Sequence, residues 1–139
     1  MRVLITNHAL AYRAGSELYV RDVAKELLRR GHTPIAYSTK LGDVALELRT
    51  ATVPVVDDLA FVSVPPDIIH GQHHIETMSA LLHFNDVPGI YFCHGWFAWE
   101  ESPPVSMKRL FDTTTTCCPL LTRSAATPHE LPLPTPEFL

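Results

Sequence analysis

The sequence predicts an α/β fold of the Rossmann-like kind, a three-layer α/β/α arrangement around a mostly parallel sheet. The prediction depends on two observations. Short apolar runs rich in β-branched residues alternate along the chain with longer segments of helical periodicity. The clearest case is the stretch Met1–Ser38, whose order of strand, loop, helix and strand is typical of a right-handed βαβ unit.

The first strand is expected over Arg2–Thr6, an apolar run suited to burial on both faces of a parallel sheet. After a loop, Ser16 is expected to cap a helix, because its hydroxyl can accept a bond from an otherwise unpaired amide. Gly31 is expected to close that helix, and a second strand follows over Pro34–Ser38. The inward stripe of the helix is expected to comprise Val20, Val23, Ala24, Leu27 and Leu28.

The alternation continues with two more helices and three more strands. In order, we expect a helix capped by Asp43, strands over Thr52–Val56 and Asp67–His70, a helix over Ile75–Phe84 and a strand over Gly89–Cys93. Pro54 places the third strand at a sheet edge, because proline cannot donate to a β ladder. The third helix is expected to turn Met78, Leu81 and Leu82 inward.

One domain is expected over residues 1–104, followed by an irregular C-terminal tail over residues 105–139. The 139 residues, 46% of them hydrophobic, suffice for one core but not for a second full domain. From Ser102 onward the chain holds seven of its twelve prolines and none of its six glycines, which favours an extended, irregular structure. The tail is either an ordinary flexible terminus or the result of a truncation or frame shift, and both interpretations stay open.

Charge and composition argue against several classes of protein. A net charge of −4 without a basic stripe argues against nucleic-acid binding. Because no apolar run approaches the length of a membrane span and the chain begins directly with a strand, we expect no transmembrane segment and a cytoplasmic location. The cysteines have neither a disulfide framework nor a zinc spacing, and reduced thiols are expected at Cys93, Cys117 and Cys118.

Polar residues gather where the predicted strands end. In an open parallel sheet, ligands bind beyond the carboxyl ends of the strands, near the point where the strand order reverses. We therefore expect the loops after the first, fourth and fifth strands to share one cleft. These loops contain Asn7 and His8, then His70, Gly71, Gln72, His73 and His74, then His94, Gly95, Trp96, Trp99, Glu100 and Glu101, with His83 at the border.

Most of these groups have two interpretations. His70, His73 and His74 could ligate a metal, but they lack a nearby cysteine or an H-E-x-x-H frame, so loop hydrogen bonds are favoured and no metal or cofactor is expected. Trp96 and Trp99 could stack on a sugar or close the end of the sheet.

Two further groups of residues also have two interpretations each. Glu100 and Glu101 could include a general base or form a solvated loop edge. Gly15 could allow a phosphate to approach the start of the first helix, although one glycine is less specific than a G-x-G-x-x-G motif.

Taken together, these motifs resemble the N-terminal domain of the GT-B glycosyltransferases, particularly glycosyltransferase family 4. They are similar to that family's first strand, its Gly-Gly-x-Glu loop, its helix-ending Gly-His, its "PD-hydrophobic-IH" strand and its strand ending in His-Gly. In the same order, the matching stretches are Met1–Ile5, Ala14–Glu17, Leu27–His32, Pro66–Gly71 and Phe92–Gly95. The resemblance ends at about Pro104.

The resemblance implies an acceptor-side domain that faces a donor-binding domain, with transfer from a nucleotide-sugar donor to a sugar or glycoconjugate acceptor in the cleft between them. It implies that His94 is catalytic, at the transfer site, and that Gly15 lies near the donor phosphates. Ala14 stands where the family has its first loop glycine, and this chain contains no donor-binding domain. The other residues expected to bind substrate are Asn7, His70, His73, Gly95, Trp96 and Glu100.

Three functional hypotheses follow. In the first, the chain is the acceptor-side part of a glycosyltransferase, completed by the rest of a longer gene product or by a separate partner. In the second, it is a stand-alone α/β ligand-binding module without catalysis. In the third, it is a histidine-rich, metal-dependent hydrolase. The resemblance favours the first, and the sequence identifies neither the donor, the acceptor nor the stereochemical outcome.

Overall fold

The computed structural model describes residues 1–94 and 115–119, which form one six-stranded sheet of order β3-β2-β1-β4-β5-β6. Every pair of neighbouring strands is parallel. The elements are β1 (Arg2–Thr6), α1 (Gly15–Arg29), β2 (Thr33–Tyr37), α2 (Asp43–Thr50), β3 (Val55–Val56), the 3-10 helix η1 (Leu59–Phe61), β4 (Ile68–Gly71), α3 (His74–His83), β5 (Gly89–Cys93) and β6 (Thr115–Pro119).

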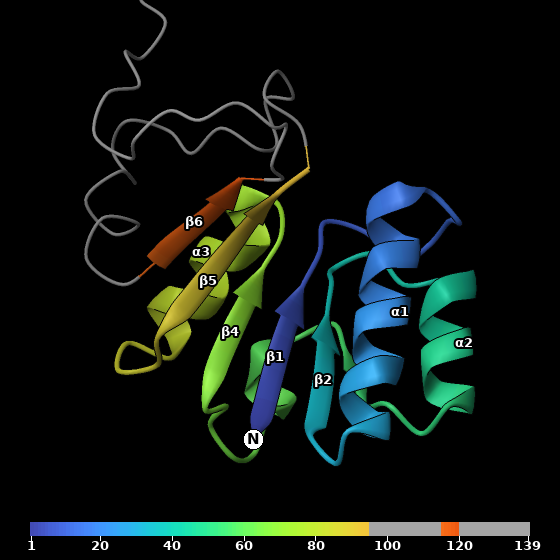
Figure 1. Cartoon of the computed structure of the whole chain (residues 1–139), viewed down its shortest axis with the longest axis horizontal. Helices are drawn as coiled ribbons and strands as arrows, with labels where there is room; N and C mark the ends of the chain where they lie inside the picture. The colour runs from blue at the N-terminus through green and yellow to red at the C-terminus, as the bar shows by residue number, and fades with distance from the viewer. Residues whose placement is uncertain (95–114, 120–139) are drawn as a thin grey trace, which may run out of the picture.

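The helices cover the sheet in two layers (Figure 1), which confirms the predicted three-layer α/β fold. α1 and α2 lie on one face, over β1 and β2, while α3 lies behind β4 and β5. From β1 the chain passes through α1 to β2 on one side, whereas β4 leads through α3 to β5 on the other side. The strand order therefore reverses between β1 and β4, where a crevice is expected at the carboxyl ends of the strands.

Side-chain alternation along β1 supplies both hydrophobic cores. Val3 and Ile5 pack with α1 and α2, whereas Leu4 packs with α3 and η1. Leu4 and Ile5 have no exposed surface, as expected for a central strand with both faces covered. The apolar run at the N-terminus thus places β1 in the middle of the sheet.

The helix α1 ends before Gly31 as predicted, but it begins earlier than predicted. It begins at Gly15 after Ala14, and no side chain caps it. Ser16 lies inside the first turn, where its hydroxyl donates to Glu17 Oε2 at 3.0 Å, so the prediction that Ser16 caps the helix was wrong. At the other end Gly31 has φ +78°, the left-handed conformation expected of a closing glycine. Leu28 is 37% exposed and lies at the border of the apolar stripe, not within it.

The structure also differs from three smaller predictions. Asp43 is the first helical residue of α2 and follows an uncapped Gly42, so Asp43 does not cap this helix. Leu82, expected to point inward from α3, is 58% exposed, while its neighbour Leu81 is 4% exposed. β3 has only two residues but lies at the sheet edge, as Pro54 predicted.

The strand β6 lies within the stretch that was expected to be irregular. It pairs with β5 in parallel over five residues, from Gly89↔Thr115 to Cys93↔Pro119. The rest of the predicted tail lies outside the described residues. Across residues 1–94 and 115–119, no helix has the length and hydrophobicity needed to span a membrane.

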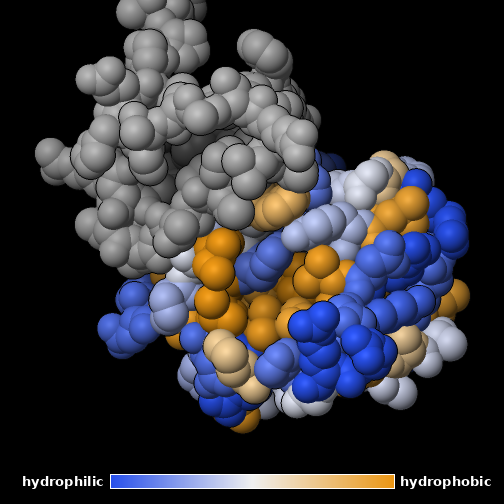
Figure 2. Space-filling view, in the orientation of Figure 1, coloured by the Kyte–Doolittle hydropathy of each residue, from blue (hydrophilic) through white to orange (hydrophobic). Residues whose placement is uncertain are grey.

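The sheet face beside α1 is apolar where α1 does not cover it (Figure 2). Ile90 on β5 is 37% exposed and pairs with His70 on β4, which in turn pairs with Ile5. Because paired residues of parallel strands share a face, His70 and Ile90 lie on the α1 side of the sheet. Tyr19 of α1 stacks on Phe92 of β5, with ring centroids 4.7 Å apart. An aromatic surface therefore borders the carboxyl ends of β4 and β5.

Candidate functional site

Histidines from three loops meet where β1, β4 and β5 end. The ring centroids of His8 and His73 are 6.1 Å apart, and those of His73 and His94 are 6.3 Å apart. His70, the third residue of β4, lies beside them, with Tyr19 of α1 contacting both His70 and His94. We call His8, His70, His73 and His94 the histidine edge. It lies at the edge of the sheet where the strand order predicts a ligand-binding crevice.

A buried polar network holds the loop after β4 against β1. The Gln72 backbone N–H donates to Thr6 Oγ1 at 3.1 Å, and the hydroxyls of Thr6 and Thr77 lie 3.0 Å apart. All three residues are at most 1% exposed. Within this network a Cβ on Gly71 would lie 2.3 Å from Thr77 Cγ2, so the backbone of β4 can approach α3 only because residue 71 is a glycine.

His73 has an unusual backbone conformation at the start of α3. Its φ of +58° lies in the left-handed region, which costs a residue other than glycine roughly 1–3 kcal/mol. The Thr77 hydroxyl holds this conformation by donating to the His73 carbonyl at 2.7 Å. The ring turns back toward β1, where Nδ1 accepts the backbone N–H of His8 at 3.2 Å. Strain of this kind is common at functional sites.

His94 directly follows β5, as the sequence predicted, and its ring is fixed on several sides. Its Nε2 lies 2.6 Å from Gln72 Oε1, so with this amide orientation Nε2 carries the proton and donates it. The rings of Phe92 and Tyr19 meet it edge-on at 5.0 Å and 5.1 Å. Gln72 is thus a residue that orients His94.

The surroundings of His70 favour its neutral form. Burial, and to a smaller extent the nearby His94, lowers the pKa of His70 below its ordinary value of 6.5. Its ring stacks on Tyr19 at 5.9 Å and on Phe92 at 6.1 Å. Its Nε2 is buried and has no hydrogen-bond partner within the described part of the chain.

Other polar atoms near the histidine edge are also unpaired. Asn7 is fully buried, and while its Nδ2 donates to the Ala9 carbonyl at 2.6 Å, its Oδ1 has no partner among the described residues. The same holds for Gln72 Nε2 and Glu76 Oε2. With His70 Nε2, these are four buried polar atoms whose hydrogen-bonding capacity the described residues leave unused, and each such group costs about 1–3 kcal/mol when it stays unpaired.

The remaining predicted site residues differ in position. Gly15 is the exposed first residue of α1, with open space where a Cβ would point. Gly95, Trp96 and Glu100 lie outside the described residues. His83 ends α3 and therefore lies at the opposite edge of the sheet, where its ring contacts Phe84. Within residues 1–94 and 115–119, no three His, Cys, Asp or Glu side chains are arranged to hold a metal ion.

Sequence reasoning assigned no role to Gln72, Glu76, Tyr19 or Lys40. The contacts of Gln72 reach Thr6 across 66 positions, and no local pattern reports such a pairing. Glu76 had one usable signal, because a carboxylate in the first turn of a helix is favoured by the helix dipole. That signal locates the helix start but not the histidine that the carboxylate contacts.

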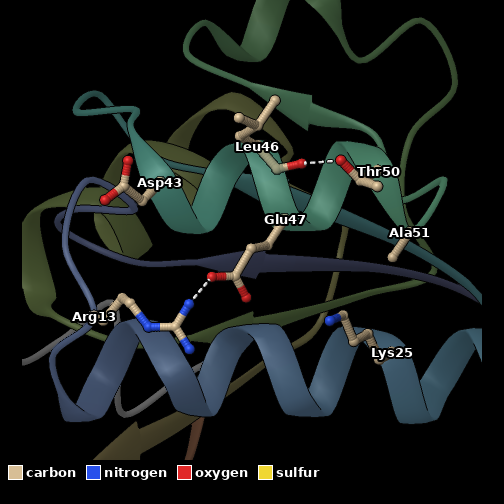
Figure 3. A pocket seen from close by; sticks show the side chains of 7 residues that line it. All are labelled: Arg13, Lys25, Asp43, Leu46, Glu47, Thr50 and Ala51. Carbon is tan, nitrogen blue, oxygen red and sulfur yellow. Dashed lines mark hydrogen bonds and ion pairs between the residues drawn. The ribbon is translucent and has the colours of Figure 1, made fainter.

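A groove of about 550 Å³ lies elsewhere, between α1 and α2 (Figure 3). Arg13 and Glu47 form an ion pair across it, so these charges satisfy each other. None of the described site residues lines it, and the histidine edge therefore remains the candidate site. The groove is lined by Arg13, Lys25, Asp43, Leu46, Glu47, Thr50 and Ala51.

The chain matches no protein-family model, no curated protein and no solved structure. Its strand order is the one found in dinucleotide-binding folds, but that architecture serves many unrelated activities. A functional conclusion must therefore be argued from the geometry of the histidine edge and from the motifs in the sequence.

Proposed function

We propose that this chain is the acceptor-side half of a glycosyltransferase, which moves a sugar from a nucleotide-sugar donor to a sugar or glycoconjugate acceptor. The observation that carries the proposal is the orientation of His94 by Gln72 at the carboxyl end of β5, where the strand order predicts a ligand-binding crevice. The motifs that resemble glycosyltransferase family 4 include this same histidine. His94 would contact hydroxyls of the transferred sugar.

The surroundings of His94 suit a carbohydrate. A sugar ring has apolar C–H faces and a rim of hydroxyls, so its site needs aromatic surface beside hydrogen-bonding groups. Tyr19 and Phe92 supply the aromatic surface. Asn7 Oδ1 and His70 Nε2 are buried and available for hydrogen bonding. Because the surroundings of His70 favour its neutral form, its ring can donate or accept, depending on its tautomer.

The proposal extends to the residues that complete the site. Gly15, at the start of α1, would lie near the donor phosphates, which helix amides attract. His73 would bind substrate beside His94. Gly95, Trp96 and Glu100 retain the substrate-binding roles that the resemblance implies. A cytoplasmic location belongs to the same proposal.

The isolated chain is expected to lack transferase activity. Catalysis requires groups that bind the transition state more tightly than the substrates, and here half of those groups would come from a donor-binding domain. That domain would be supplied by the remainder of a longer gene product or by a separate partner. A ligand-binding module without catalysis would use the same histidine edge, so the test must separate binding from transfer.

The test combines ring-proton NMR of the histidines with a transfer assay. In the full chain, nucleotide sugars and oligosaccharides should shift the signals of His70 and His94 but not that of His83. When the donor-binding half is added, transfer should appear, and His94→Ala should remove most of it with little change in the thermal midpoint, while His83→Ala has no effect. Binding without transfer would favour the binding module. Absence of both would overturn the proposal.

A further inference from the structure

The groove between α1 and α2 has its central charges paired within the chain. Arg13 donates to the Glu47 carboxylate across the groove (Figure 3), and Arg21 of α1 reaches the same carboxylate at 3.4 Å. These three side chains satisfy one another. The middle of this groove of about 550 Å³ is therefore a poor site for a small ionic ligand, which would have to break the pairs.

Two further charges lie at opposite ends of the groove and have opposite signs. Asp43 is the first residue of α2, whereas Lys25 lies on α1 toward the end at which α2 finishes with Thr50 (Figure 3). Both side chains are exposed. Neither of them makes a hydrogen bond or an ion pair with another described residue. The surface over the groove is thus negative at one end and positive at the other.

An exposed apolar side chain lies between the two charged ends. Leu46 is 66% exposed and stands in the middle of α2, about one turn after Asp43 and one turn before Thr50. A partner that covered this leucine would remove apolar surface from water, which favours association. We call Lys25, Asp43, Leu46 and the groove between them the α1–α2 surface.

We propose that the α1–α2 surface binds a second copy of this chain about a two-fold axis. An axis perpendicular to the groove at its middle reverses the direction of the groove, so Lys25 of each copy meets Asp43 of the other. The same rotation lays α2 of each copy antiparallel on α1 of the other, which covers Leu46. A surface with opposite charges at its two ends is complementary to itself in this arrangement.

The size of the α1–α2 surface limits the strength of the contact. At 1.5 Å per residue, α1 is about 22 Å long and α2 about 12 Å, and neighbouring helices pack about 8–10 Å apart. A patch of these dimensions is smaller than the roughly 800 Å² per partner of a standard interface. We therefore expect a reversible dimer with a Kd on the order of 10 μM.

The first arm of the test locates the contact. In sedimentation velocity, the full chain should shift from monomer toward dimer as its concentration rises through the micromolar range. Leu46→Arg should keep it monomeric over that range. Leu82→Arg is the matched control, because Leu82 is 58% exposed on α3, which covers the other face of the sheet, and it should leave the Kd unchanged. A wild-type chain that stays monomeric throughout would refute the proposal.

The second arm tests the two-fold arrangement by exchanging charges. Lys25→Glu alone, or Asp43→Lys alone, places like charges opposite each other twice in the dimer and should weaken it about tenfold or more. An equimolar mixture of the two variants should restore the wild-type Kd. In the mixed dimer the introduced glutamate faces the introduced lysine, and the native Lys25 of one copy faces the native Asp43 of the other.

Each outcome of this arm supports or contradicts the proposal. Restoration on mixing requires that both ion pairs cross between copies, and it excludes unfolding of the single variants, since an unfolded chain would not recover a partner. Weakened single variants without restoration would rule out the two-fold axis. A dimer that tolerates Lys25→Glu, Asp43→Lys and Leu46→Arg would be formed by another surface. No transfer assay enters the test, so its result is independent of the proposed function.

Discussion

Gly71 and Thr77 approach so closely that a Cβ on the glycine would lie 2.3 Å from Thr77 Cγ2. Thr77 is 1% exposed and its hydroxyl donates to the His73 carbonyl, so this side chain cannot rotate away without cost. The contact fixes the distance between the end of β4 and the start of α3. It therefore determines where Gln72 and His73 lie.

Gly71→Ala should destabilise the protein by roughly 1–3 kcal/mol, because the added methyl overpacks a filled site. Gly15→Ala is the matched control. No atom lies within 4 Å of the Cβ position of Gly15, and alanine is favoured over glycine in a helix. Urea denaturation should give a lower midpoint for Gly71→Ala and an equal or higher one for Gly15→Ala. Equal midpoints for both variants would contradict the close approach.

Two adjacent leucines of α3, one buried and one exposed, provide a second comparison. Leu81 is 4% exposed and packs in the core with Leu4 and Ile69, while its neighbour Leu82 is 58% exposed. Leu81→Ala should cost about 2–5 kcal/mol of unfolding free energy, as usual for emptying a buried leucine site. Leu82→Ala should change it by less than about 0.5 kcal/mol. A large effect at Leu82 would show that α3 is rotated from the described position.

The two leucines also illustrate how far the sequence predicts this fold. Periodicity predicted a helix over residues 75–84, within one residue of α3 at each end, but Leu81 and Leu82 are adjacent, and hydrophobicity alone placed both inside. The position of the sheet behind the helix decides which of them is buried. The same reason explains why Leu28 is exposed. It continues the apolar pattern of α1, but it lies at a border of the helix that the sheet does not cover.

The strands were easier to predict than the caps. Apolar runs located β1, β2, β4 and β5 to within about two residues, since burial on both faces needs continuous hydrophobicity. Ser16 and Asp43 are good capping residues that lie one or two positions inside their helices, because the preceding loops, not the side chains, determine where each helix starts. β6 has the sequence Thr-Thr-Cys-Cys-Pro, which lacks the longer apolar run of the other strands, and it pairs with β5.

The site was predicted in outline from one topological rule. The rule that ligands bind at the carboxyl ends of parallel strands selected the loops of His8, His73 and His94, and these loops do meet. The rule placed Gln72 in the same cleft but gave it no role, and it did not select Glu76, because their contacts with His94 and His8 cross 22 and 68 positions of the chain.

The half-buried position of His70 predicts how stability depends on pH. The folded protein favours the neutral ring, since its pKa lies below 6.5, whereas the unfolded chain binds a proton once the pH falls below that value. The unfolded state then binds more protons, so stability should fall as the pH is lowered from 6.5 toward the folded-state pKa. Above 6.5 the contribution of His70 should be constant.

His70→Phe removes this titration while retaining a ring that stacks on Tyr19 and Phe92. The unfolding free energy of the variant should therefore depend less steeply on pH in the mildly acidic range than that of the wild-type protein. Denaturant titrations of both proteins at a series of pH values measure the difference. Parallel curves would mean that His70 binds a proton equally well in the folded and unfolded states.

Gln72 allows the orientation of His94 to be tested apart from its presence. Gln72→Leu removes the amide oxygen that lies 2.6 Å from His94 Nε2, and it also removes Nε2 of Gln72, a buried donor without a partner among the described residues. The lost hydrogen bond is worth about 0.5–1.5 kcal/mol, while burial of the unpaired donor costs about 1–3 kcal/mol. These terms oppose each other, so the net change in unfolding free energy should be small.

Binding should respond differently from stability. Without the amide, the His94 ring is no longer fixed by a hydrogen bond to Gln72, and the ligand must supply the ordering that the protein had provided. Oligosaccharide or nucleotide-sugar binding, followed by the ring-proton signals of His94, should weaken several-fold in Gln72→Leu although the urea midpoint stays near that of the wild-type protein. Unchanged affinity at unchanged stability would show that Gln72 does not orient His94 for a ligand. The contact between Gln72 and His94 would then no longer support the proposed function.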